Sequence, residues 1–299
     1  MSAGSNVAEA SIPVDLFNPG QVFACLGCAE VAEVLFGGVE GCFDWSDRTA
    51  VRFRLRASGD DPPIRGVLRF LSQAKVISQA PHGSSNIAAW KGSWGRTPDE
   101  LPEGAPYPSP DPESPATLLA LLRTDEAEVR IDHWADTVRD NVKFWAGAGG
   151  YPGAALTRDA VELIREGASA AADDPFAMGV PQSSSFRLDW RRDYVPIDAG
   201  FSLNAHGGAV RSVGYPLVEL LGAIGLTHAR PRRFAKLEYG YGVVGASRGV
   251  KWSPLSFLRV ALGAPAMPFE TRRFRMSLSW PGKEGQARAI TQVWEGWES

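Results

Sequence analysis

The stretch IPVDLFNPGQVFACLGCAEVAEVLFGG (Ile12–Gly38) places a short strand, a turn and an apolar helix in immediate succession. Its first residues alternate between apolar and polar side chains, which is typical of a half-buried strand. The tripeptide NPG (residues 18–20) has turn chemistry. Apolar residues then recur near helical spacing over residues 21–36, and two glycines at 37–38 supply a stop. The sequence therefore predicts strand, turn and packed helix.

Two cysteines of this helix, Cys25 and Cys28, have the spacing of a metal or redox pair. Structural zinc needs four ligands, however, and the only other cysteine is Cys42, while the four histidines are scattered singly. Cysteine also behaves as a small apolar residue. We therefore predict that the pair packs in the core, and no metal or other cofactor is expected.

Two strands are predicted next, in VEGCFDW (residues 39–45) and TAVRFRLRA (residues 49–57). In the second strand, apolar residues at 51, 53 and 55 face one way and arginines at 52, 54 and 56 face the other. This row of arginines has two interpretations. It is either a face that contacts RNA or the solvated face of an antiparallel sheet.

The rest of the chain alternates between helical and strand patterns. Strands are predicted at 128–134, 184–190, 237–244, 271–280 and 287–295, and helices at 116–123, at 136–145, from an N-cap at Thr157, from Tyr215-Pro216 to Gly225, and from Ser253-Pro254 to Gly263. These patterns indicate an α+β (mixed α/β) fold with antiparallel sheets and packed helices, for which RRM-like elements are one possible arrangement.

Residues 96–115 contain seven prolines and no strong apolar periodicity, so they are interpreted as an exposed loop or linker. We expect a single compact unit over residues 1–299. The alternative is a boundary within this segment, which would give two parts, 1–115 and 116–299.

Composition limits the class of protein. The 299 residues are 44% apolar, an ordinary value for a globular chain, and three cysteines do not suggest a disulfide framework. The N-terminus has no Lys or Arg in its first 15 residues, and the apolar run at 215–226 is too short for a bilayer. A cytoplasmic protein without a membrane partner is expected.

The net charge of −3 is unevenly distributed. Residues 1–117 hold 9 Lys/Arg and 14 Asp/Glu, which is −5, whereas residues 183–280 hold 14 Lys/Arg and 6 Asp/Glu, which is +8. A polyanion would be attracted to the second region and not to the first.

Catalytic motifs are absent from the sequence. There is no Walker phosphate loop and no G-x-S-x-G nucleophile motif, and Asp132-His133 is an isolated pair. The glycine-rich GAGGYPG (residues 147–153) lacks the context of a dinucleotide site. We therefore expect no enzyme activity. The alternative is a metal-independent enzyme that uses Asp198, Asn204 and His206.

Nucleic-acid binding agrees better with the basic region, because guanidinium groups contact phosphates and aromatic rings stack on unpaired bases. Aromatic residues lie among its arginines, and AHGG (residues 205–208) and GASRGVKW (residues 245–252) have the composition of flexible contact loops. The predicted contact residues are Arg187, Arg191, Arg192, Asn204, His206, Arg230, Arg232, Arg233, Arg248 and Lys251.

Several motifs occur in a characteristic order. They are NPGQVFACLGCAEVAEVLFGGVEGCF (residues 18–43), KFWAG (143–147), SFRLDWRRDYVPIDAGFSLNAHG (185–207), YPLVELLGAIGL (215–226) and HARPRR (228–233). In this order they resemble a CRISPR-associated family, the large-subunit-like component of type I-U (also type I-G) Cascade effector complexes.

The resemblance implies a non-catalytic subunit of a crRNA-guided complex. Its partners would be the backbone and crRNA-processing subunits, crRNA, target double-stranded DNA and the helicase-nuclease. It would help to recognise the motif that flanks the target (the PAM), bind target DNA, stabilise strand opening and support recruitment of the helicase-nuclease. In such complexes guide pairing reads the sequence and the protein holds phosphates and reads the flanking motif. A scaffold that contacts only proteins is the remaining alternative.

Overall fold

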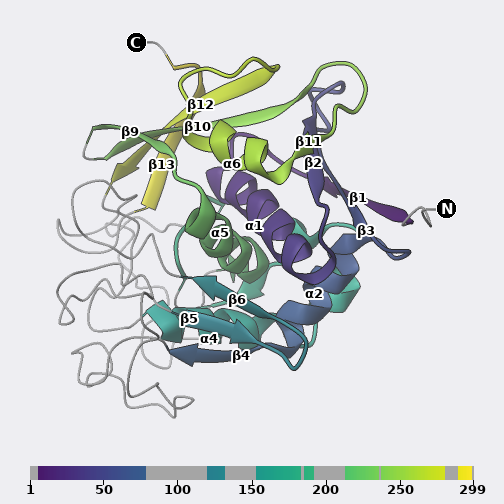
Figure 1. The fold of residues 1–299 in the computed structure, drawn as a ribbon. Coiled ribbons are helices and arrows are strands. Elements are labelled where there is room, and N and C mark those ends of the chain that lie inside the picture. Colours follow the sequence, from purple (N-terminus) through teal and green to yellow (C-terminus); the bar gives the residue numbers. More distant parts are fainter. Residues whose placement is uncertain are drawn as a thin grey trace, which may run out of the picture.

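One curved sheet, with strands from both ends of the chain, organises the fold (Figure 1). The computed structural model describes residues 6–78, 120–131, 153–182, 185–191, 213–235, 237–279 and 289–297. The expected helix at 136–145 and the proline-rich segment 96–115 lie outside these residues.

The large sheet has the strand order β1-β3-β2-β10-β12-β13, with β11 paired to β2 and β9 paired to β10. All neighbouring strands are antiparallel except β2 and β10, which are parallel. The strands are β1 (Val7–Pro13), β2 (Glu40–Asp44), β3 (Arg52–Ser58), β9 (Arg232–Ala235), β10 (Glu238–Ala246), β11 (Ser253–Pro254), β12 (Thr271–Ser279) and β13 (Ala289–Glu295).

The first part of the sheet is a split β-α-β unit. Strands β1 and β2 are each antiparallel to β3, which lies between them, and helix α1 (Pro19–Phe36) connects them. An RRM-like element has this topology, which other split β-α-β folds share. The full RRM-like order is not reached, because β4 (Lys75–Ser78) pairs with β5 (Ala120–Arg123) in a second sheet that continues to β6 (Glu128–Ile131).

The α+β fold class is therefore confirmed. Among the described residues, the other helices are α2 (Pro63–Gln73), α4 (Gly153–Ile164), α5 (Pro216–His228) and α6 (Leu255–Gly263). Two short strands, β7 (Val180–Pro181) and β8 (Val213–Gly214), pair with each other. Two 3₁₀ turns, Ala168–Ala171 and Pro175–Ala177, follow α4. Figure 1 shows the large sheet curving around α1, α5 and α6, with the β4-β5-β6 sheet at the other end of the helices.

Helices α1 and α5 lie side by side at the centre and approach each other through glycines. A Cβ atom on Gly27 would lie 1.8 Å from the Leu221 carbonyl oxygen, and one on Gly225 would lie 2.2 Å from the Phe23 carbonyl oxygen. Only hydrogen at these positions allows the two backbones to come so close. The small residues of the opening stretch thus set the distance between the two central helices.

Helix α1 is long and apolar enough, by length and composition, to cross a bilayer. It is nevertheless mostly buried inside the protein, under the sheet and against α5. Such burial is typical of the core helix of a globular domain.

Several predicted elements are confirmed. Helix α1 begins at Pro19 with Asn18 as its N-cap and ends before Gly37, whose φ of 70° favours glycine. Residues of β3 alternate between buried and half-buried as expected, and β10, β12 and β13 are antiparallel closing strands. Both cysteines of the helix are fully buried.

Other predictions were wrong. Residues 120–123 form strand β5 and not a helix. The prediction failed because a short apolar run has the same appearance in a buried strand and in a buried helix. Thr157 is not an N-cap, since α4 already begins at Gly153 and buries it. Gly225 does not end α5, which continues to His228. The sequence patterns also gave no indication of α2.

The described residues of the expected strand at 184–190 are not a strand. The backbone N–H groups of Leu188 and Asp189 bond to a side chain of α5, and Arg187 has a φ of 60°. The carboxylate of Glu219 thus accepts the backbone hydrogen bonds that a neighbouring strand would accept in the predicted sheet.

Elements from both sides of the proline-rich segment share the large sheet and the core. The parallel pairing joins Phe43 to Gly245 and Asp44 to Ala246. A division into 1–115 and 116–299 would separate these two strands.

Candidate nucleic-acid interface

The predicted contact residues fall into separate groups in the structure. Arg187 and Arg191 lie near the first turn of α5, and Arg230, Arg232 and Arg233 follow its last turn. The helix has 13 residues and is therefore about 20 Å long. The two groups are thus at opposite ends of α5. Arg192, Asn204 and His206 lie outside the described residues, as does Asp198 of the enzyme alternative.

Arg191 is held by the protein itself. Its Nε and Nη2 donate to the carboxylate of Asp189 at 3.1 and 2.6 Å, and Nη2 also donates to the Phe176 carbonyl oxygen at 2.7 Å. The guanidinium lies 3.6 Å from the centre of the Tyr215 ring. Because the Asp189 side chain is fully buried, its charge would be left uncompensated if Arg191 moved to a phosphate, so we leave Arg191 out of the interface.

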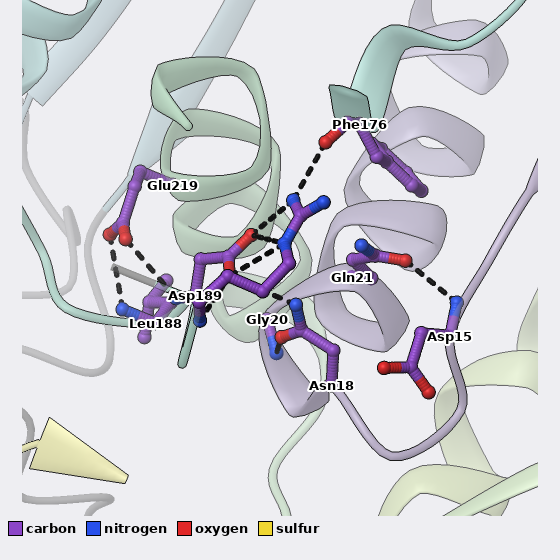
Figure 2. Close-up of polar contacts among 9 residues, drawn as sticks. Asp15, Asn18, Gly20, Gln21, Phe176, Leu188, Asp189 and Glu219 are labelled. Carbon is purple, nitrogen blue, oxygen red and sulfur yellow. Dashed lines mark hydrogen bonds and ion pairs between the residues drawn. The ribbon is translucent and has the colours of Figure 1, made fainter. Parts of the chain in front are cut away.

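The same carboxylate connects to the start of α1, as Figure 2 shows. Asn18 donates from Nδ2 to Asp189 Oδ1 at 2.9 Å, and its Oδ1 accepts from the Gly20 N–H at 3.1 Å. The Glu219 carboxylate, in the first turn of α5, accepts from the N–H groups of Leu188 and Asp189, each at 3.1 Å. Asn18 and Asp189 are bonded within the protein, so this buried network fixes the segment 185–191 against the start of α1.

The row of arginines on β3 is largely neutralised by its neighbours. Arg54 Nη2 lies 3.3 Å from Asp44 Oδ2, and Arg56 Nη2 lies 2.5 Å from Glu40 Oε2. Both acids are on strand β2. Arg52 donates from Nη2 to the Ser11 carbonyl oxygen. A phosphate would have to compete with these partners, so the pairs favour the solvated-face interpretation of this strand.

A second group of arginines is arranged differently, around aromatic rings on β9, β12 and the end of β13. The Arg275 guanidinium lies 4.4 Å from the centre of the Phe234 ring and 6.0 Å from that of Trp294. Phe234 meets Trp297 edge to face at 5.7 Å. We call this set the arginine–aromatic cluster; it consists of Arg232, Phe234, Arg273, Arg275, Trp294 and Trp297.

The cluster keeps more positive charge than the β3 row. Arg275 is paired with Glu238 at 2.8 Å. In the part of the chain that the structure describes, Arg232 and Arg273 have no acidic group within ion-pair distance. Cations beside partly exposed rings are a combination that binds single-stranded nucleic acid.

Sequence reasoning placed Arg232 in a binding site and left out Arg273, Trp294 and Trp297. The basic run at 228–233 identified the first. The others depend on the pairing of β9, β12 and β13, which the sequence patterns do not specify. The available signal was the pair of tryptophans in VWEGW, near the C-terminus and close in sequence to the arginines of β12.

Arg248 and Lys251 are exposed on the connection between β10 and β11, as expected for a contact loop. The neighbouring Trp252 ring is covered by Arg56, whose guanidinium lies 4.5 Å from the ring centre. These two cations remain predicted phosphate contacts at the other end of β10 from the cluster.

The three cysteines are free and buried. Burial raises the pKa of the Cys28 thiol to about 12 and that of Cys42 to about 11, and it also raises the pKa of Cys25. Among the described residues, no group of three or more His, Cys, Asp or Glu could hold a metal ion. The geometry favours packing for the cysteine pair.

We therefore expect native protein to resist thiol labelling. Ellman's reagent at mildly alkaline pH should react with Cys25, Cys28 and Cys42 only as fast as the protein unfolds, because the reactive thiolate is disfavoured and shielded. All three should react at once in concentrated guanidinium chloride. Rapid labelling of one thiol in the folded protein would contradict this prediction.

Comparison with known proteins matches this chain to no family model, no curated protein and no solved structure.

Proposed function

We propose that this protein is a non-catalytic, nucleic-acid-binding subunit of a crRNA-guided type I CRISPR effector (Cascade) complex. In this role it binds target DNA, helps to recognise the flanking motif, stabilises the opened strands and supports recruitment of the helicase-nuclease. Its partners are the backbone and crRNA-processing subunits and the guide RNA. The order of sequence motifs motivates the assignment to this complex.

The observation that carries the proposal is the arginine–aromatic cluster. Two of its guanidinium groups, on Arg232 and Arg273, have no acidic partner among the described residues, whereas the β3 arginines have acidic or backbone partners. Guanidinium groups without an acidic partner are available for phosphate oxygens, which they bind in a bidentate geometry. This is the chemistry that a subunit of a guide–target complex requires.

Charge reversal at Arg232 and Arg273 tests the proposal. The protein is co-expressed with its neighbouring effector subunits and a guide RNA, and binding of the complex to duplex target DNA is measured across a salt series. If the two arginines each contact a phosphate, the double variant R232E/R273E should bind more weakly, and the slope of log K against log[salt] should fall by about two.

A matched control exists on helix α2. Arg65 and Arg69 are exposed and have no ion pair among the described residues, so R65E/R69E makes the same change in net charge at a distant surface. This variant should leave the slope unchanged. The proposal fails if the wild-type chain never co-purifies with guide RNA, or if both double variants have the same effect.

A further inference from the structure

A pocket of about 460 Å³ opens between β9, β12 and the end of β13. Its volume is in the range of about 300–1,000 Å³ that is usual for small-molecule sites. Aromatic rings and guanidinium groups share its lining, which consists of Arg232, Phe234, Pro265, Thr271, Arg273, Glu295, Gly296 and Trp297.

Trp297 is fixed in this pocket by the backbone. Gly296 has a φ of 116°, a conformation that favours glycine, and its N–H donates to the Arg273 carbonyl oxygen at 2.8 Å. The indole Nε1 of Trp297 then donates to the Phe274 carbonyl oxygen at 2.7 Å. The end of β13 is thereby turned so that its last described side chain is held against the sheet.

Strand β10 has a glycine, Gly240, at the position against which the rings of Phe234 and Trp297 pack. A Cβ atom on Gly240 would be 2.6 Å from both Phe234 Cε2 and Trp297 Nε1, so a larger residue would displace the rings. The indole is therefore held in place before any ligand arrives. Pre-organisation of this kind reduces the entropy lost when a ligand binds.

Two cations flank the indole. The guanidinium of Arg273 lies 5.6 Å from the centre of the Trp297 ring, and that of Arg232 lies 5.9 Å from it. The acid in the lining, Glu295, is occupied by Arg272, whose Nε and Nη2 donate to it at 2.7 and 2.8 Å. These bonds lower the pKa of Glu295 and compensate its charge, so its repulsion of an anion is reduced.

We infer that this pocket takes one unpaired nucleotide of a single-stranded nucleic acid, with the base stacked on Trp297 and its phosphates on Arg232 and Arg273. The inference rests on the proposed function and adds the strand state and the contact residues. A base inside a duplex is stacked on both faces, so it has no free face for an indole, whereas an unpaired base has.

The test measures oligonucleotide binding by fluorescence anisotropy, with the full-length chain both alone and in its co-purified complex. The probes are a labelled oligothymidine, the oligouridine of the same length, an abasic oligomer with the same phosphates, and polyglutamate as competitor. The variant Trp297→Leu should bind oligothymidine or oligouridine about 5- to 150-fold more weakly, the range that loss of one stacking contact predicts.

Three further results are expected. Trp297→Phe, which keeps a ring, should retain most of the affinity. Trp190→Leu, which removes a half-exposed tryptophan outside the pocket, should bind like wild type. The abasic oligomer should bind wild type and Trp297→Leu equally. Oligothymidine and oligouridine differ in the base methyl group as well as in the 2′-hydroxyl, so oligodeoxyuridine is measured too, and its comparison with oligouridine shows whether the strand is DNA or RNA. Circular dichroism and thermal melting show that each variant is folded.

The inference is overturned if wild type binds the abasic and intact oligomers equally well, because phosphates alone would then explain the binding. It is also overturned if polyglutamate displaces the oligonucleotide as well as unlabelled oligonucleotide does. In both cases the salt-slope result for Arg232 and Arg273 can still support the proposed function. If neither the chain nor its complex binds any oligonucleotide or duplex, both proposals fail.

Discussion

Replacement of Asp189 by alanine is expected to lower the free energy of unfolding by about 3 kcal/mol. The carboxylate is buried and accepts from three groups, which are the guanidinium and the backbone N–H of Arg191 and the side-chain amide of Asn18. Alanine would leave the Asn18 amide without its acceptor, in a place that water does not reach. It would also release Arg191, and with it the contact to the Phe176 carbonyl oxygen.

Chemical denaturation with an unchanged m-value would measure this loss. The matched control is Glu128→Ala, which removes an acid from the ion pair with Arg123, in which both side chains are about half exposed. That variant should lose less than about 1 kcal/mol, because exposed pairs contribute little. Equal losses for the two variants would show that burial of Asp189 does not matter and would contradict the prediction.

Replacement of Gly27 by alanine is expected to lower the free energy of unfolding by about 2–3 kcal/mol, the upper part of the range for overpacking a core. Alanine favours a helix by about 1 kcal/mol over glycine, so local propensity alone predicts stabilisation. The new methyl group would, however, lie 1.8 Å from the Leu221 carbonyl oxygen. Because that atom belongs to the backbone of α5, no side-chain rotation relieves the clash, and the helices must move apart.

Gly222→Ala is the control for this prediction. Its Cβ atom would meet the Cδ1 atom of Leu188 at 2.9 Å, and its next neighbours lie at ordinary contact distance. A flexible leucine tip can move, so we expect a change of less than about 1 kcal/mol. The close-approach argument is wrong if Gly27→Ala is as stable as Gly222→Ala in parallel melts.

Local patterns predicted those elements whose packing follows the sequence period. The alternation in residues 51–57 predicted β3 because one face of that strand is buried. The residues from Asn18 to Gly37 predicted α1 because its cap and its stop are both local. Residues 185–191 alternate in the same way, yet they bond to Glu219 and to the start of α1, contacts that no local pattern contains.

In the candidate interface, too, the residues that local sequence identifies could be predicted, and those that strand pairing brings together could not. Arg232 and Arg233 could be predicted because they form a basic run, and the sequence itself shows such a run. Trp297 could not, because its place depends on the turn at Gly296 and on the gap above Gly240, which arise only when β10, β12 and β13 pair. Arg191, like Arg232, lies in a basic stretch of the sequence. The structure distinguishes the two arginines, because Arg191 is paired with the buried carboxylate of Asp189.

The parallel pairing of β2 with β10 also has a consequence for the order in which the chain can fold during synthesis. Phe43 pairs with Gly245, so the edge of β2 has no parallel partner until about 200 further residues have been made. At about 5–20 residues per second, that delay is roughly 10–40 s. During most of this time α5 has not been synthesised, so the apolar, glycine-lined side of α1 has no helix to pack against. A nascent chain of this protein therefore exposes the unpaired edge of β2 and the apolar side of α1 at the same time. Both surfaces promote aggregation, so we expect a ribosome-associated chaperone to bind them.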